Sequence, residues 1–268
     1  MNNPPSVALT IAGSDSGGGA GIQADLKTFH SFGVFGCSAL TAVTAQNTVE
    51  VVAVHPVPED VVRAQIDAVA TDLPPDAVKT GMLNTTAVVE TVADTLVEHR
   101  FPNYVLDPVM VSTSGHRLLD DDAVDAIRRE LLPLALVVTP NLPEARILTG
   151  LAISRREEFH DAARALIDFG ATAALVKGGH LEGGEAVDLL LTPEGEHIWS
   201  RPHLDTTAGH GTGCTLSAAL AAGLALGRTL PEAVADAVGY VARALADAPL
   251  LGAGHRPINH LVPPLEDR

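Results

Sequence analysis

Short β-branched runs alternate with alanine-rich helical stretches along the whole chain, and this alternation limits the available folds more than any other feature of the sequence. It is typical of βαβ units, in which crossover helices join parallel strands. Nearly half of the residues are apolar but only 3% are aromatic, so alanine, valine and leucine must fill the interior. The sequence therefore predicts an α/β fold with a mainly parallel central sheet.

The individual elements follow from this pattern and from the glycine, proline, threonine or aspartate residues that close most strands. Strands are expected at Val7–Ile11, Cys37–Thr44, Ala77–Lys79, Tyr104–Leu106, Leu136–Val138 and Ala173–Val176. Helices are expected at Ile22–Phe32, Pro58–Ala70, Thr86–His99, Asp121–Leu132, Arg155–Phe169, Thr215–Ala225 and Glu232–Asp247.

The pattern changes between Val176 and Thr206, where two short apolar strands follow each other without room for a helix. Val187–Leu191 and His197–Arg201 are joined by the turn Thr192–Glu196, which predicts a β-hairpin. Such a hairpin would add a small antiparallel edge to the parallel sheet. No linker is long enough to separate domains, so residues 1–268 are expected to form one domain.

Charge and cysteine content restrict the partners and the compartment. The formal net charge of −16 opposes binding to nucleic acid or to an anionic membrane surface. Cys37 and Cys214 are the only cysteines, which is too few for a disulfide scaffold and lacks metal-ligand spacing. The N-terminus has no basic segment, and its first apolar strand is too short for export. A cytoplasmic protein with small-molecule partners is therefore expected.

A glycine-rich run, Gly13–Gly21, directly follows the first predicted strand. Ligands of open α/β sheets bind beyond the carboxyl ends of the strands, and glycine lets the backbone approach them closely. A loose dinucleotide fingerprint, Gly19–Ala24, lacks the acidic residue expected about 20 positions later. No lysine follows a glycine, so the P-loop motif is absent. The run is either a ligand-binding loop or a flexible surface turn.

A second glycine-rich run, Gly209–Cys214, precedes the predicted helix at Thr215. Its backbone N–H groups and the positive helix end would form a phosphate site. Cys214 would then lie at a helix N-terminus, where the pKa of a thiol can fall by one or more units and produce a reactive thiolate. The alternative is a buried, inert cysteine, which is the role that we assign to Cys37.

Three charged residues also follow strands, at the edge where ligands are expected. Asp107 and Glu144 are candidate carboxylates for Mg²⁺ bound with nucleotide phosphates, or they are ordinary helix-capping residues. Lys177 precedes two glycines and is either a phosphate contact or a solvated strand-end lysine. Neither an HExxH motif nor a Cys/His cluster occurs, which argues against a zinc site.

Together and in this order, these residues resemble the bacterial hydroxymethylpyrimidine/phosphomethylpyrimidine kinases of the ribokinase-like superfamily. The resemblance extends through nearly the whole chain. It is carried by Ile11–Asp25, Thr44–Thr48, Lys79–Met82, Asp107–Val111, Thr139–Glu144, Val176–His180, His210–Cys214 and Gly254-His255.

The resemblance implies a ribokinase-like three-layer α/β/α sandwich and an ATP-dependent kinase of thiamine biosynthesis that acts on a hydroxymethylpyrimidine and then on its monophosphate. It implies that the pyrimidine lies near Gly13, Asp25, Gln46, Met82 and Val109, with Asp25 and Gln46 hydrogen-bonded to the ring. It further implies ATP at Lys177, Gly211, Thr212 and Gly213, Mg²⁺ reached through Asp107 or Glu144, Cys214 as the catalytic base beside Gly211 and Gly213, and a homodimer.

Two segments depart from the family pattern. Ala208-Gly209 replaces the usual Asn-Thr before the second glycine-rich run, and Arg256 replaces a glycine after Gly254-His255. Three alternatives therefore stay open. The chain is also compatible with a pyridoxal or pyridoxine kinase of the same superfamily and with a non-catalytic pyrimidine-binding protein, and more weakly with an NAD-binding oxidoreductase.

Overall fold

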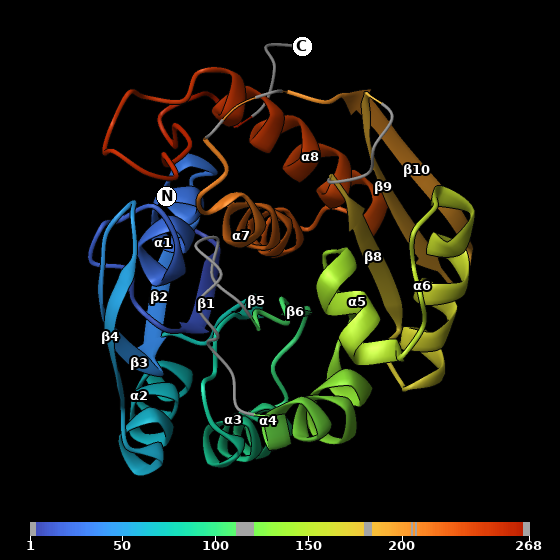
Figure 1. Cartoon of the computed structure of the whole chain (residues 1–268). Helices are drawn as coiled ribbons and strands as arrows, with labels where there is room; N and C mark the ends of the chain where they lie inside the picture. The colour runs from blue at the N-terminus through green and yellow to red at the C-terminus, as the bar shows by residue number, and fades with distance from the viewer. Residues whose placement is uncertain (1–3, 111–120, 180–183, 205, 207, 265–268) are drawn as a thin grey trace.

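The computed structural model describes residues 4–110, 121–179, 184–204, 206 and 208–264 (Figure 1). Its strands are β1 (Val7–Ala12), β2 (Phe35–Leu40), β3 (Ala42–Gln46), β4 (Val51–Pro56), β5 (Ala77–Thr80), β6 (Tyr104–Leu106), β7 (Val137–Val138), β8 (Ala173–Gly178), β9 (Glu185–Thr192) and β10 (Gly195–Pro202). Its α-helices are α1 (Gly21–Ser31), α2 (Glu59–Asp72), α3 (Thr86–His99), α4 (Asp121–Ala126), α5 (Leu142–Thr149), α6 (Phe159–Asp168), α7 (Thr212–Ala225) and α8 (Leu230–Ala246).

The main sheet has the order β10-β9-β8-β7-β6-β5-β1-β2. All neighbouring strands from β8 through β7, β6, β5 and β1 to β2 pair in parallel. Strands β9 and β10 form the expected antiparallel hairpin at the other edge, where β9 pairs antiparallel with β8. Helices α1, α7 and α8 cover one face, and α2 to α6 cover the other (Figure 1). The predicted three-layer α/β/α architecture is confirmed.

Apolar burial follows from the strand sequences. Along β1, Leu9 and Ile11 pack into the core beneath α2 to α6, and Ala8 faces the opposite core with Phe29 of α1. Because side chains alternate between the faces of a strand, a run that is apolar throughout can supply both cores at once. None of the described helices combines the length and apolar composition that a membrane crossing requires.

The single strand expected at Cys37–Thr44 is wrong. The chain bends at Thr41, so that β2 stays in the main sheet and β3 pairs with β4 in a separate antiparallel sheet. The bend is fixed by hydrogen bonds, because the Thr41 amide donates to the Ala12 carbonyl at 3.1 Å and its hydroxyl donates to the Met82 carbonyl at 2.6 Å. The small sheet places Gln46 over the end of β1.

Other elements and boundaries also differ from the prediction. Helix α5 was not expected, and it begins one residue after Asn141, whose side chain forms a capping box with Glu144. The helix expected at 121–132 consists of α4 followed by a π-helical turn, Ile127–Leu131. Helix α7 begins at Thr212 instead of Thr215, because Gly211 adopts the left-handed conformation (φ 83°) that ends the loop and starts the helix.

The strand order reverses next to β1. The chain leaves β1 for α1 on one face of the sheet, and leaves β5 for α3 on the other. The loops after these two neighbouring strands therefore diverge and leave a crevice beyond their carboxyl ends. Such a crevice is where open α/β sheets bind ligands.

Candidate active site

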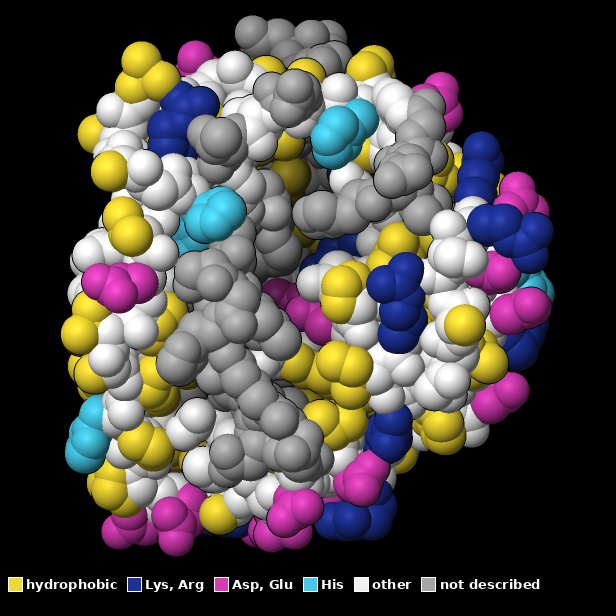
Figure 2. Space-filling model, in the orientation of Figure 1, with side chains coloured by type: hydrophobic (Ala, Val, Ile, Leu, Met, Phe, Trp, Pro, Cys, Tyr) yellow, Lys and Arg dark blue, Asp and Glu magenta, His cyan; other side chains and the backbone are white. Residues whose placement is uncertain are grey.

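A cleft of about 890 Å³ occupies this crevice. Figure 2 shows a hollow in this face with charged side chains deep inside it. The cleft brings together nearly all of the predicted site residues, namely Gly13, Gln46, Met82, Asp107, Val109, Glu144, Lys177, Gly211, Thr212, Gly213 and Cys214. Val111 and His180, which end two of the segments that carry the family resemblance, lie outside the described residues.

Asp15 organises the first glycine-rich loop. Its carboxylate accepts hydrogen bonds from the backbone N–H groups of Gly17 at 2.8 Å, Gly19 at 3.0 Å and Ala20 at 2.8 Å. Burial alone would raise the pKa of Asp15, but the hydrogen bond and the charge of His210, together with the backbone donors, hold this pKa below its usual value. The loop is therefore a fixed turn around a carboxylate.

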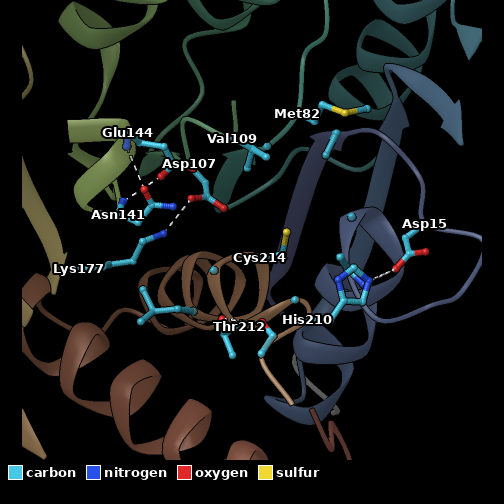
Figure 3. Close-up of a pocket in the computed structure, with 18 of the residues that line it drawn as sticks. Asp15, Met82, Asp107, Val109, Asn141, Glu144, Lys177, His210, Thr212 and Cys214 are labelled. Atoms are coloured by element: carbon cyan, nitrogen blue, oxygen red, sulfur yellow. Dashed lines mark hydrogen bonds and ion pairs between the residues drawn. The ribbon is translucent and has the colours of Figure 1, made fainter. Parts of the chain in front are cut away.

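The two glycine-rich runs are joined directly. His210 Nε2 lies 2.8 Å from Asp15 Oδ2, as Figure 3 shows. A Cβ on Gly211 would lie 1.8 Å from the Gly19 carbonyl oxygen, so only glycine permits this approach. The loop after β1 and the start of α7 thus form one packed unit.

The N-terminal turn of α7 enters the cleft. Thr212, Gly213 and Cys214 line it, and no side chain caps the helix at Gly211. The N–H groups of the first turn and the positive helix end are therefore available to an anion. The glycine-rich run therefore leads into the helix as the sequence predicted, but the helix begins three residues earlier than expected.

The lowered pKa expected for Cys214 is wrong for the free chain. Removal of water from around the sulfur raises the pKa of this thiol to about 11, although the charge of Lys79 and a backbone N–H from Gly21 act in the opposite direction. A helix N-terminus offsets only part of a large desolvation cost. Cys214 is therefore a neutral thiol, partly exposed at the floor of the cleft.

A second group of charges lies across the cleft from Asp15 and His210 (Figure 3). Lys177 Nζ lies 3.2 Å from Asp107 Oδ1, and Ser217 donates to the other Asp107 oxygen at 3.0 Å. Burial would raise the pKa of Asp107, but Lys177 and Lys79 lower it. The same carboxylate raises the pKa of Lys177 against the effect of burial, so the pair is charged.

Glu144 completes this group. Burial raises the pKa of Glu144 to about 7, and the negative charge of Asp107 adds to the effect of burial. Two carboxylates beside one lysine leave the group short of positive charge, and carboxylate oxygens are ligands that Mg²⁺ prefers. No cluster of three or more potential ligands occurs in the described part of the chain. The donor set fits a Mg²⁺ ion completed by water and phosphate oxygens.

The opposite end of the cleft is apolar. Met82 and Ala42 are buried together, with Val54 and Val109 packed against them. A Cβ on Gly13 would come within 2.2 Å of the Met82 methyl group, so Gly13 leaves the room that this side chain needs. Gln46 supplies a carboxamide at the rim, 3.5 Å from His210. This end can hold a flat ring with a polar edge.

The prediction that Asp25 binds the ring is not supported by its position. Asp25 does not line the cleft, and its side chain is fully buried against Lys79 at 2.8 Å and the Thr10 hydroxyl at 2.6 Å. Burial raises the pKa of Asp25, an effect that Lys79 partly offsets. The sequence placed Asp25 one helical turn after the glycine run, but could not show which way the carboxylate points.

Sequence reasoning also missed several residues that line the cleft. They include Asp15, Lys79, Asn141, Asp188, Arg201, His210 and His255. Arg201 is paired with the buried Asp188 at 2.5 Å on neighbouring strands of the hairpin. A signal existed for Asp15 and His210, which interrupt the glycine-rich runs. The departure at Ala208-Gly209 buries Ala208 and leaves open space beside Gly209.

Known proteins resemble this chain along nearly its whole length. The sequence model described as phosphomethylpyrimidine kinase matches residues 15–259. The hydroxymethylpyrimidine/phosphomethylpyrimidine kinase of Rhizobium meliloti is 53% identical over 260 residues, which cover 95% of this chain and 96% of that protein. The thiamine biosynthesis bifunctional protein ThiED of Geobacter sulfurreducens is 48% identical, and this chain spans about half (53%) of its length while 97% of this chain is matched.

Solved structures give the same outline. A pyridoxal kinase of Bacillus subtilis in complex with ADP superposes with a TM-score of 0.90 at 38% identity, covering 96% of this chain and 98% of that one. A phosphomethylpyrimidine kinase of Clostridium difficile superposes with a TM-score of 0.81 at 41% identity, covering 90% of this chain and 99% of that one. The ribokinase-like fold expected from the sequence is thereby confirmed.

Proposed function

This chain belongs to the phosphomethylpyrimidine kinase family, and from that premise we propose how its cleft carries out the family's reaction. The chain is an ATP-dependent kinase of thiamine biosynthesis. It phosphorylates 4-amino-5-hydroxymethyl-2-methylpyrimidine and then the resulting monophosphate. The observation that supports this function best is one cleft with an apolar ring pocket at one end and a helix N-terminus beside Lys177 at the other.

The pyrimidine lies in the apolar end, between Met82 and Val109 and above Gly13. Gln46 offers both a donor and an acceptor, which an aminopyrimidine edge can pair with. A ring with the wrong pattern would leave the carboxamide unpaired, and this penalty is how a polar contact rejects close analogues. Asp25 has no direct part in this recognition because its side chain is fully buried behind Lys79 and does not line the cleft.

ATP lies with its terminal phosphates at the N-terminus of α7. The transferred group, on which charge develops, is surrounded by the backbone of Gly211–Gly213, the hydroxyl of Thr212 and the ammonium of Lys177. Phosphoryl transfer needs mainly alignment and neutralisation of this charge. The substrate hydroxyl then faces Cys214, which accepts the hydroxyl proton in the first step once its thiol has lost its own proton to solvent. The second step attacks through a phosphate oxygen and has no such requirement.

Asp107 and Glu144 hold Mg²⁺ in this proposal, through water or directly. The ion supplies positive charge to the phosphates when it is bound. Before it binds, Lys177 balances only one of the two carboxylates. Asp107 keeps its place through Ser217, and Glu144 keeps its place through the capping box of α5.

The raised pKa of Glu144 predicts a pH-dependent metal affinity. Glu144 is largely protonated below pH 7 and charged above it. We therefore expect the affinity for Mg²⁺ with ADP, measured by calorimetric titration, to fall about tenfold from pH 8 to pH 6. Glu144→Gln should bind Mg²⁺ more weakly at pH 8 and lose this pH dependence.

Glu232→Gln is the matched control for that experiment. Glu232 holds the same third position of a capping box, at the start of α8 with Thr229, and does not line the cleft. It should reproduce any loss of helix capping while keeping the pH dependence of metal affinity. An unchanged pH dependence in Glu144→Gln would contradict the assignment of this carboxylate.

A pyridoxal kinase remains the second candidate, because the superposition on the Bacillus subtilis pyridoxal kinase is close. An assay of ADP release separates the two functions, with ATP and Mg²⁺ present and either the hydroxymethylpyrimidine or pyridoxal as acceptor. Mass spectrometry identifies the products. We expect the mono- and diphosphate of the pyrimidine. Phosphorylation of pyridoxal alone would favour the second candidate, and no ADP release above background would contradict both.

We further propose that residues 1–268 form one domain, since the cleft draws on residues from Ala12 to His255. A homodimer is supported by the small β3–β4 sheet, whose exposed face carries Val43, Ala45 and Ala53. A cytoplasmic location is supported by Cys37 and Cys214, both of which are unpaired. Size-exclusion chromatography with light scattering tests the dimer.

A further inference from the structure

An ion pair near Cys214 is left unused by ring binding and by phosphate binding. Lys79 Nζ lies 2.8 Å from Asp25 Oδ2, and both side chains are fully buried. Thr10 donates to the same oxygen, whereas Asp25 Oδ1 has no hydrogen-bond partner among the described residues. Burying two charges costs them their hydration, and their mutual attraction often does no more than offset this cost. Stability is therefore a weak explanation for this pair.

The fold brings this pair close to the Cys214 thiol. Lys79 is on β5, Asp25 is on α1, and α7, which carries Cys214 in its first turn, packs against both. The backbone N–H of Gly21, at the start of α1, donates to the Cys214 sulfur. Lys79 and Cys214 line the cleft, while Asp25 lies behind Lys79.

Four charged groups act on the Cys214 thiol, from β5, α1, β8 and the loop after β6. Lys79 and Lys177 favour the thiolate, and Asp25 and Asp107 oppose it. Lys177 and Asp107 form one pair and Lys79 and Asp25 form the other. Because Lys79 is the strongest of the charges that favour the thiolate and Asp25 partly cancels it, the two members of this pair act on the sulfur in opposite directions.

We infer that Lys79, held by Asp25, is the positioning residue whose buried charge stabilises the Cys214 thiolate, the form of this side chain that can accept the proton of the substrate hydroxyl. This inference rests on the proposed function. The Cys214 thiol first releases its own proton to solvent, and in the first phosphorylation the substrate O–H bond then breaks and its proton moves to the Cys214 thiolate sulfur. A bond forms between the hydroxyl oxygen and the γ-phosphorus of ATP, and the bond from that phosphorus to ADP breaks.

Alkylation of Cys214 tests the inference without any need for turnover. In a Cys37→Ala background Cys214 is the only thiol, and its reaction with iodoacetamide at pH 8 reports the thiolate fraction. One pKa unit corresponds to a tenfold change in that fraction. We expect Lys79→Met to react about tenfold more slowly than the parent, and Asp25→Asn to react about tenfold faster. A purely structural role would move both variants in the same direction.

Matched controls separate local charge from general effects. Arg228→Met and Asp236→Asn make the same charge changes in a surface ion pair at 3.7 Å, and should leave the alkylation rate within about twofold of the parent. Lys79→Met leaves a buried carboxylate unpaired, which threatens folding. The double variant Lys79→Met/Asp25→Asn removes both charges and should fold, with an alkylation rate between those of the single variants.

Kinetics then connect the thiol to catalysis. The pH profile of the first phosphorylation should move to higher pH in Lys79→Met and to lower pH in Asp25→Asn, with little change in the second phosphorylation. The inference is overturned if the alkylation rates of folded Lys79→Met and Asp25→Asn change in the same direction. It is also overturned if both rates stay within twofold of the parent. If alkylation responds as expected but Cys214→Ser keeps full first-step turnover, the base role fails while the charge effect stands.

Discussion

Replacement of Cys214 by alanine is expected to lower the rate of the first phosphorylation by about 10²–10⁴-fold, the usual contribution of a positioned base. The second phosphorylation should be nearly unchanged, because its attacking phosphate oxygen is already deprotonated. Quenched-flow or steady-state assays with the alcohol and the monophosphate as separate acceptors measure the two rates. The selective loss is the signature of a group that handles a proton and not one that holds ATP.

Cys37→Ala is the control for this experiment. Cys37 is buried in β2, away from the cleft, and its removal should leave both rates unchanged at moderate temperature. An equal loss of both steps in Cys214→Ala would instead indicate that the sulfur positions the phosphates. An unchanged first step would show that another group accepts the proton, and the neutral state of the free thiol makes this outcome worth testing.

Gly211→Ala is expected to lower kcat/KM for both phosphorylations by at least about 10²-fold, because a displacement of roughly 1 Å at a catalytic site costs that much. Gly211 has a φ of 83°, where an alanine is strained by roughly 1–2 kcal/mol. The added Cβ would also lie 1.8 Å from the Gly19 carbonyl oxygen, so the loop after β1 must move away from α7. The ring pocket and the phosphate site then lose their alignment.

Gly227→Ala, just beyond the other end of α7, separates these two effects. Gly227 has a similar φ of 78°, but a Cβ there would meet nothing within 4 Å. It should lower the free energy of unfolding, measured by urea denaturation, by roughly 1–2 kcal/mol and leave the kinetics unchanged. Equal kinetic effects in the two variants would show that strain alone, and not the contact with Gly19, matters.

The architecture was predictable because apolar periodicity reports burial directly. The hairpin β9–β10 and the alternation of parallel strands with helices followed from run lengths and turn residues alone. The break at Thr41 did not, since Cys37–Thr44 is continuously strand-forming and the bend is set by contacts with Ala12 and Met82 from other strands. Helix α5 was hidden because its short length and its one proline, Pro143, obscure the periodicity.

The site was predictable in membership but not in chemical state. Residues after parallel strands must gather at one edge, so Asp107, Glu144 and Lys177 were found from position and order. The state of Cys214 was not, because desolvation depends on every element packed around the sulfur and outweighs the helix end. The direction of the Asp25 side chain likewise depends on Lys79, which lies 54 positions later in the sequence.

The contact between Gly19 and Gly211 also bears on how the protein is made on the ribosome. The ring pocket is built from segments that emerge early, whereas the turn at Gly211 that packs against Gly19 is synthesised about 100 residues after Val109. Contacts so distant in sequence slow folding, and N-terminal segments begin to fold first. The ATP-binding geometry of a growing chain therefore forms only after α7 has been synthesised. Until then, the surface of α1 that contacts α7 stays uncovered.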